Sequence, residues 1–329
     1  MVLAPSLLPQ LVVGGVSLIV LIRAAGVAID RLTSVAQAYE VPDALIAMSV
    51  IAIGTSLPEI GSHVIASLGI LSGSLDYVVT SATVLGGNMG SSTAQQTLLV
   101  GVFLIAYGRV DLSKTFVRST YAPMLYAVGL TFALAWDRSF SRVDGLVLVG
   151  SYVALIYLSF NRRQRVKPLP GEGSENVPRD VAVSLAAMAA VFGSAFVTLR
   201  VVETLVDNLA LGGSMIGVVT IGVASALPEF SAVMDSIRRQ APYIALGTLV
   251  GSNVVNPLVG IGLGATISTY RVPQAVVLWD LPFKLVVGVG FFLYLRYVTD
   301  RRVGRREGFY LVSLYFVYLG VRLVVFPGQ

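Results

Sequence analysis

Apolar segments of about twenty residues follow one another along almost the entire chain. An α-helix needs about 20 such residues to cross a bilayer. Only 12% of the 329 residues are charged, whereas soluble domains carry about 25%. The sequence therefore predicts an all-α polytopic membrane protein with ten transmembrane helices, at 9–29, 43–70, 78–108, 115–136, 143–160, 181–206, 212–236, 242–267, 276–297 and 308–325.

A single long polar stretch interrupts this pattern. Residues 161–180 combine charges, prolines and glycines, a composition typical of a linker. Fifteen Lys and Arg residues, with Arg118 at the start of the fourth span included, fall in this linker and on the same side of the membrane, and three fall in the opposite loops. The positive-inside rule then places the linker in the cytoplasm and both termini outside, in the plasma membrane. The predicted organisation is a five-helix unit at 1–160, the linker, and a second five-helix unit at 181–329.

Two stretches of the sequence resemble each other. Residues 52–59 read AIGTSLPE and residues 222–229 read GVASALPE, each in the second span of its unit. A segment that begins with Gly-Ser follows each copy, at Gly90 and Gly251. Because each unit has an odd number of spans, the two copies would have opposite orientations in the membrane. Inverted repeats are typical of secondary transporters, which bind their substrate near the midplane of the bilayer.

Each copy places a glutamate inside an apolar helix, where a charge is costly and usually functional. Glu59 and Glu229 both follow a proline, which frees a backbone carbonyl about one turn earlier. The chain has no cysteine and one histidine, so soft metals are disfavoured and no resident cofactor is expected. Hydroxyl and amide side chains at helical spacing add oxygen donors suited to hard cations such as Ca²⁺ and Na⁺, namely Thr55, Ser225, Ser91, Gln95, Ser252 and Asn256.

The other polar residues in or near the spans are expected to have lesser roles. His63 lies one turn after Glu59, and we expect it to face a cavity rather than to tune that carboxylate. Arg23, Arg200 and Lys284 are expected to reach the membrane surface or to pair locally.

The paired motifs resemble the α-repeats of the Ca²⁺/cation antiporter superfamily, and above all prokaryotic Na⁺/Ca²⁺ exchanger membrane regions. The likeness rests on GTSLPE at 54–59, on its second copy, and on the amide four residues after each Gly-Ser serine. It covers nearly the whole chain. The resemblance implies ten spans and an ion site that includes the two glutamates, Thr55, Ser56, Ser225, Ser91, Gln95, Ser252, Asn256 and the backbone carbonyls of Ala52 and Gly222.

The sequence departs from the family pattern at a few of these positions. Ala226 lacks the hydroxyl that the first copy carries. Gln95 is a longer amide and Asn256 is uncharged, where many members carry Asp. Ser92 replaces the Asn that Asn253 retains. These differences bear on ion stoichiometry and selectivity rather than on the class of protein.

The predicted function is secondary active antiport of Ca²⁺ for Na⁺, or for H⁺, by alternating access at a central site with two glutamates. Na⁺ is favoured because hydroxyls, amides and freed carbonyls can surround it, whereas protons need only the two carboxylates. The predicted partners are inorganic cations and the lipid bilayer, without nucleic acid, and a monomer suffices. An H⁺-coupled exchanger of another divalent cation is the alternative.

Two remoter functions are disfavoured. A passive cation channel fits inverted repeats with two distinct half-sites less well than alternating access does. An intramembrane hydrolase lacks its motifs, because one histidine cannot form His-Glu-x-x-His and no Gly-x-Ser-x-Gly accompanies it. The sequence therefore predicts no enzymatic activity.

Overall fold

A computed structural model describes residues 7–38, 55–160, 174–208, 212–238 and 242–328. Up to residue 160 the helical segments, with π-helical ones labelled η, are α1 (Leu7–Ala38), α4 (Leu57–Leu71), α5 (Tyr77–Thr93), η2 (Ala94–Leu99), α6 (Val100–Tyr107), α7 (Lys114–Phe116), η3 (Val117–Tyr121), α8 (Ala122–Leu134) and α9 (Arg142–Phe160).

The helical segments after the linker are α10 (Val177–Asn208), α11 (Gly213–Gly217), η4 (Val218–Gly222), α12 (Val223–Ser225), α13 (Leu227–Arg238), α14 (Pro242–Val255), η5 (Asn256–Ile261), α15 (Gly262–Ile267), η6 (Val276–Asp280), α16 (Leu281–Tyr297) and α17 (Arg305–Val325). Four two-residue strands complete the described part of the chain, β1 (Val110–Asp111), β2 (Ser139–Phe140), β3 (Tyr270–Arg271) and β4 (Arg302–Val303).

Each predicted span coincides with a helix or with a succession of helical segments. The second span can be compared only from residue 55 onward, since its predicted start lies outside the described residues. Among the described residues, seven helices are long and apolar enough to cross a membrane, and α4 is a shorter apolar helix. The chain is an all-helical polytopic membrane protein, as the sequence predicts.

Many large aliphatic side chains are exposed on the bundle, and its interior holds polar side chains. Leu8, Val286 and Val324 are 63%, 70% and 80% exposed. In contrast, Glu59 and Glu229 are buried. Large exposed aliphatic side chains suit contact with lipid, and buried ionisable residues in such a bundle mark ion pathways.

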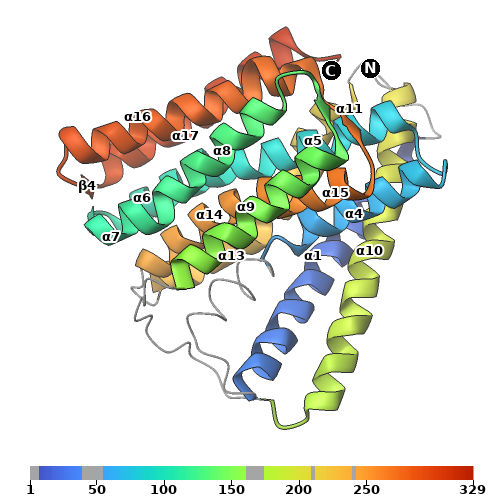
Figure 1. Cartoon of the computed structure of the whole chain (residues 1–329), viewed down its shortest axis with the longest axis horizontal. Helices are drawn as coiled ribbons and strands as arrows, with labels where there is room; N and C mark the ends of the chain where they lie inside the picture. Colours follow the sequence, from blue (N-terminus) through green and yellow to red (C-terminus); the bar gives the residue numbers. More distant parts are fainter. Residues whose placement is uncertain (1–6, 39–54, 161–173, 209–211, 239–241, 329) are drawn as a thin grey trace.

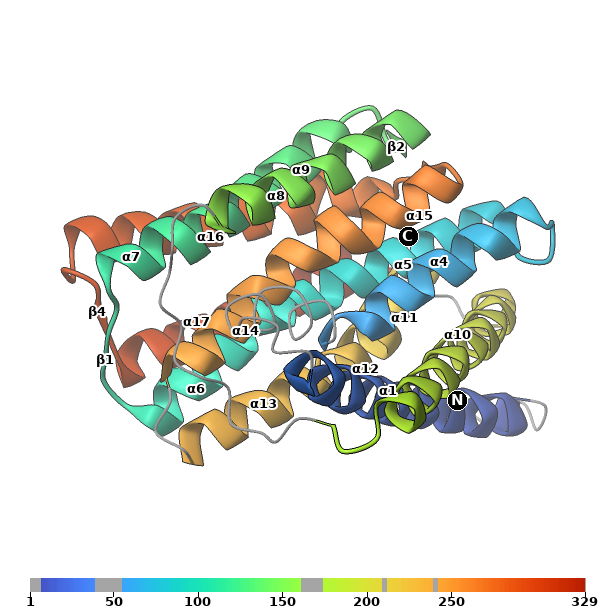
Figure 2. The ribbon, with the colours of Figure 1, turned by 60° about the horizontal axis from the view of Figure 1, so that its bottom comes forward.

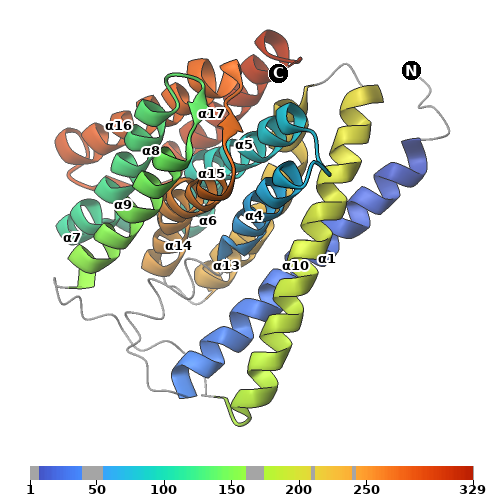
Figure 3. The same cartoon turned by 45° about the vertical axis from the view of Figure 1, so that its right-hand side comes forward.

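The helices form a bundle in which α4, α5, α14 and α15 lie between two outer groups (Figure 2). On one flank α1 and α10 pack side by side, and on the other lie α8, α9 and α16 (Figures 1 and 2). The start of α1 and the end of α17 lie at one end of the bundle, and the end of α9 and the start of α10 lie at the other (Figure 3).

Several features occur in matching pairs before and after the linker. β1 pairs antiparallel with β4, and β2 pairs antiparallel with β3, with the two small sheets at opposite ends (Figure 2). The π-helical segments η3 and η6 each precede a proline at the start of the next helix, Pro123 and Pro282. A proline lacks an N–H and its ring displaces the carbonyl one turn earlier, which favours the wider π turn.

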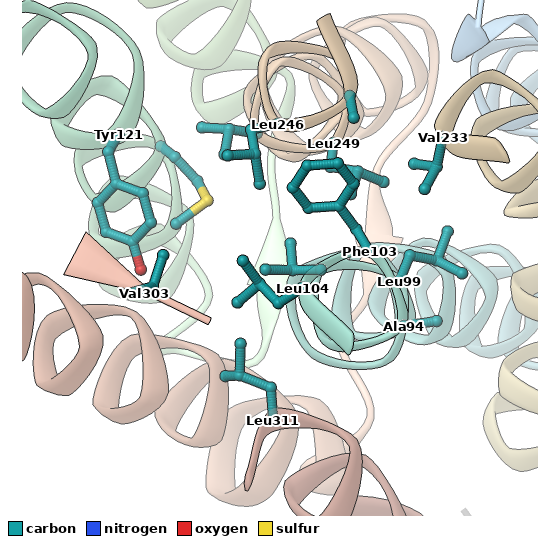
Figure 4. Packing of buried hydrophobic residues seen from close by; sticks show 14 of the residues in the cluster. Ala94, Leu99, Phe103, Leu104, Tyr121, Val233, Leu246, Leu249, Val303 and Leu311 are labelled. Carbon is teal, nitrogen blue, oxygen red and sulfur yellow. The ribbon is translucent and has the colours of Figure 1, made fainter. Parts of the chain in front are cut away.

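The largest apolar cluster joins helices from both parts of the chain. Phe103 and Leu104 of α6 pack with Leu249 of α14 and Leu311 of α17, near Val303 of β4 (Figure 4). This packing holds α6 against α14 and α17, and α6 continues directly from the polar segment η2.

Candidate cation-binding site

Each copy of the Leu-Pro-Glu motif begins a helix. α4 starts at Leu57 and α13 starts at Leu227, so each proline occupies a position whose N–H has no intrahelical partner. The backbone N–H of Ile60 donates to the carbonyl of Ser56 at 2.9 Å, and the equivalent bond of the second copy is 3.0 Å long. Each glutamate therefore stands in the first turn of a helix, where the helix dipole favours a negative charge.

The two glutamates are buried, with 1% and 0% of their surface exposed. The hydroxyl of Ser91 donates to Glu59 Oε1 at 2.6 Å, and Asn256 Nδ2 donates to the same oxygen at 3.3 Å. Gln95 Nε2 donates to Glu229 Oε1 at 3.2 Å and to Ser91 Oγ at 3.1 Å. The pair Ser91 and Gln95, one turn apart, thus connects the two carboxylates.

Several oxygen atoms at this centre have no hydrogen-bond donor within the described part of the chain. They are Glu59 Oε2, Glu229 Oε2, Asn256 Oδ1 and Ser56 Oγ. Buried polar atoms in proteins are nearly always paired. Carboxylate, amide and hydroxyl oxygens without donors are the ligands that Ca²⁺ and Na⁺ prefer.

A glycine contact between η4 and α5 brings the two motifs together. A side-chain carbon at Gly222 would lie 2.9 Å from the backbone nitrogen of Ser91 and 3.0 Å from the carbonyl oxygen of Gly87. Only glycine allows η4 to approach the α5 backbone this closely. The contact positions Ser91 beside Glu59.

The remaining predicted ligands lie at or close to the same centre. Thr55 Oγ1 and Ser252 Oγ are 3.2 Å apart and hydrogen-bonded across the two motifs. The hydroxyl of Ser225 donates to the carbonyl of Gly222 at 3.4 Å. Ala52 lies outside the described residues.

The amide of Gln95 is oriented differently from the expected oxygen donor. Its NH₂ group faces Glu229 and Ser91, while its carbonyl oxygen accepts a hydrogen bond of 3.1 Å from Asn253. In this arrangement Gln95 holds the carboxylate in place and turns its oxygen toward a second polar group.

Of the two placements expected for Lys284, the structure shows local pairing. Its side chain is 1% exposed and does not reach the membrane surface. The ammonium donates to Ser92 Oγ and, at 3.2 Å, to Asn253 Oδ1. The sequence signal was its position well inside the span 276–297, too far from either end to reach the surface.

His63 differs from its expected place, because it is 1% exposed and enclosed by protein. Its Nε2 lies 3.2 Å from Asn88 Nδ2 and its Nδ1 lies 3.3 Å from the hydroxyl of Tyr270. These contacts connect α4 to α5 and β3 and leave the carboxylate of Glu59 to other partners.

The remaining basic residues are close to expectation. Arg200 is exposed and pairs with Glu203 at 3.3 Å, and Arg23 is exposed.

Asp280 forms a fully buried ion pair with Arg322, at 3.1 Å.

The helical membrane fold with buried carboxylates at its centre defines a membrane transporter for cations. A family model described as "Sodium/calcium exchanger protein" matches residues 10–161 and 180–324. The match covers most of the sequence, so the chain belongs to the sodium/calcium exchanger family, whose members are transporters rather than enzymes.

Individual proteins are similar to this chain over most of its length. The inner membrane protein YrbG of Escherichia coli is 27% identical over 312 residues, which cover 89% of this chain and 91% of the relative. The H⁺/Ca²⁺ exchanger CAX superimposes with a TM-score of 0.77 at 16% identity, over 97% of this chain and 82% of that one. The sodium-calcium exchanger NCX_Mj gives 0.63 at 18% identity, over 95% and 99%. The two structures show a shared fold.

Proposed function

We propose that this chain is a secondary antiporter that exchanges Ca²⁺ for Na⁺ by alternating access at Glu59 and Glu229. The observation that supports this most is the pair of buried carboxylates, each with one oxygen that lacks a donor in the described structure. Two carboxylates supply negative charge for a cation, and hard oxygen ligands match the chemistry of Ca²⁺. In the described residues no cluster of three or more His, Cys, Asp or Glu side chains offers another metal site.

The proposed ligand set surrounds these carboxylates. Glu59 and Glu229 would bind Ca²⁺ directly, with Asn256 as the amide whose oxygen is free. Hydroxyl and backbone carbonyl oxygens would bind Na⁺ or complete the coordination shell of Ca²⁺. The hydroxyls are those of Thr55, Ser56, Ser91, Ser225 and Ser252, and the carbonyls are those of Ala52 and Gly222. Gln95 would exchange its hydrogen bond to Glu229 for a contact with the ion.

The same charges explain why transport would be an exchange. When Ca²⁺ leaves, two carboxylates remain in an interior of low dielectric, where bare charges are very costly. The empty carrier cannot reorient until Na⁺ or protons replace the lost charge. Ca²⁺ would therefore cross only in return for another cation.

The paired features of the fold support two inverted five-helix repeats, at 1–160 and 181–329, with ten spans. The matching strand pairs, π-helical segments and glutamate-bearing helices are those expected of such repeats. The start of α1 and the end of α17 lie at one end of the bundle, and the end of α9 and the start of α10 lie at the other (Figure 3). This arrangement is consistent with external termini and a cytoplasmic linker in the cell membrane. A cysteine introduced at Ser174 should react with an impermeant thiol reagent only from the cytoplasmic side, and labelling of intact cells would contradict this topology.

The exchange itself can be tested with the purified chain in proteoliposomes. Vesicles loaded with Na⁺ should take up Ca²⁺ without a pH gradient and with a protonophore present. Uptake that fails there and instead follows an imposed pH gradient would identify H⁺ as the counter-cation. Uptake without any counter-cation gradient would indicate a channel. Competition by other divalent cations would test the selectivity for Ca²⁺.

A further inference from the structure

The ammonium of Lys284 donates to two uncharged oxygen atoms, Ser92 Oγ and Asn253 Oδ1. The hydroxyl of Ser92 donates its own hydrogen to the carbonyl of Asn88 at 2.6 Å, so its lone pairs face the lysine. Asn253 Nδ2 donates to the carbonyl of Leu249 at 2.9 Å, which turns Asn253 Oδ1 toward the ammonium. Neutral hydroxyl and amide oxygens oriented in this way are also the ligands of a bound monovalent cation.

An oriented chain of amides leads from this ammonium to the proposed ion site. Lys284 donates to Asn253 Oδ1, Asn253 Nδ2 donates to Gln95 Oε1 at 3.1 Å, and Gln95 Nε2 donates to Glu229 Oε1 at 3.2 Å. Each amide turns its oxygen toward the cation and its NH₂ group toward the carboxylate. Aligned dipoles of this kind stabilise a positive charge at one end and a negative charge at the other.

The acidic residue on the same helix is already paired. Asp280, one turn before Lys284, has its carboxylate beside the guanidinium of Arg322, and both side chains are fully buried. With that pair balanced, the charged side chains left at the centre of the described part of the chain are Glu59, Glu229 and Lys284. Two ionised carboxylates and one ammonium have a net charge of −1, rather than the −2 of the carboxylates alone.

The lysine has no counterpart in the first half of the chain. When Tyr121-Ala-Pro123 is aligned with Asp280-Leu-Pro282, Lys284 corresponds to Leu125. A cavity of about 30 Å³ also reaches this network, and its mostly apolar lining includes Gln96, Asn253 and Tyr121. One side of the site therefore carries a fixed cation, and the related position on the other side does not.

We infer that the ammonium of Lys284 is a tethered cation that takes the place of one transported monovalent cation beside the two-glutamate site. The inference rests on the proposed antiport function. Because the lysine cannot leave, it reduces by one the number of counter-cations required when Ca²⁺ departs. It also repels Ca²⁺, so it sets both the stoichiometry and the affinity of the exchanger.

Lys284→Met tests this role, because methionine keeps most of the apolar stem and vacates the position of the ammonium. The variant is expected to move one more counter-cation per Ca²⁺ than the wild type, measured from tracer flux ratios or from the reversal potential in proteoliposomes. Its Ca²⁺ affinity in detergent should rise about tenfold, since a nearby unit charge is removed. Lys284→Arg should keep the wild-type stoichiometry, and Leu125→Met, at the related position, should change neither quantity.

Different outcomes separate the two proposals. If the wild type binds Ca²⁺ but does not exchange it for any counter-cation, the proposed antiport function is wrong. The Ca²⁺ affinity of Lys284→Met would still test whether the lysine weakens Ca²⁺ binding. If Lys284→Met exchanges Ca²⁺ with unchanged stoichiometry, the tethered-cation role is overturned. If neither Lys284→Met nor Lys284→Gln folds while Lys284→Arg does, the lysine acts in stability alone. That result would also overturn the tethered-cation role.

Discussion

The surroundings of Glu59 and of Glu229 differ more than the two motifs that carry them. Near Glu59 the second layer is uncharged, and it consists of His63, Asn88 and Tyr270 joined by hydrogen bonds. Near Glu229 the hydrogen bonds lead through two amides to the charged side chain of Lys284. The two related motifs thus place their glutamates in different electrostatic environments.

This difference shows where the proposed repeats have diverged. One turn after Glu59 stands His63, and the related position after Glu229 is Val233. One copy of the motif thus carries a histidine where the other carries a valine, and Lys284 stands where the first half carries Leu125. Related carboxylates in unlike surroundings need not contribute equally to ion binding, and substitutions can separate their contributions.

Removal of either carboxylate is expected to have the largest effect. Glu59→Gln and Glu229→Gln should each reduce Ca²⁺ flux by about 100-fold or more, because several kcal/mol of attraction for Ca²⁺ are lost in a low-dielectric site. Glu229→Gln should be the more severe, since the chain of amides from Lys284 would then end on an uncharged group. Ca²⁺ uptake by proteoliposomes measures both.

The exposed Glu175 provides the control for these substitutions. Glu175→Gln should transport at the wild-type rate. Normal flux in Glu229→Gln would contradict the two-carboxylate site, and equal losses in both variants would weaken the distinction between the two environments.

The glycine contact that aligns the two halves is expected to have an intermediate effect. Gly222→Ala would place a methyl group against backbone atoms of Ser91 and Gly87 that cannot move independently. We expect a loss of about 2 kcal/mol in the free energy of unfolding, seen as a lower Tm in detergent. Gly150→Ala is the control, because a methyl group there meets nothing within 4 Å in the described structure. Equal Tm values for the two variants would show that the close approach is unnecessary.

The neutral network around His63 is expected to matter least for transport. Tyr270→Phe removes a hydroxyl that donates to the carbonyl of His63 at 2.9 Å and lies 2.7 Å from Ser67 Oγ. Stability should fall by about 1 kcal/mol, and the number of counter-cations per Ca²⁺ should stay unchanged. Tyr297→Phe, at a residue that is 74% exposed, is the control. An altered stoichiometry in Tyr270→Phe would mean that the network takes part in ion coupling.

Much of the fold could be predicted because its signals are local. The apolar segments specify helices and a membrane, since a long run of apolar side chains is favourable in lipid and costly in water. The prolines at 58 and 228 indicated that helical hydrogen bonding is interrupted within the second span of each unit, because a proline lacks the N–H that the helix interior requires. Glu59 and Glu229 stood out since a carboxylate is rarely placed in an apolar helix without a function.

The tertiary structure alone decided which atoms meet at the centre. The sequence singled out Lys284 and His63 as polar residues but could not indicate that one bonds to Asn253 and the other to Tyr270. Such contacts depend on how each helix is rotated about its axis and on how closely two backbones approach, as at Gly222. The orientation of the Gln95 amide is also a tertiary property, because its two ends differ only in the partners that neighbouring helices supply.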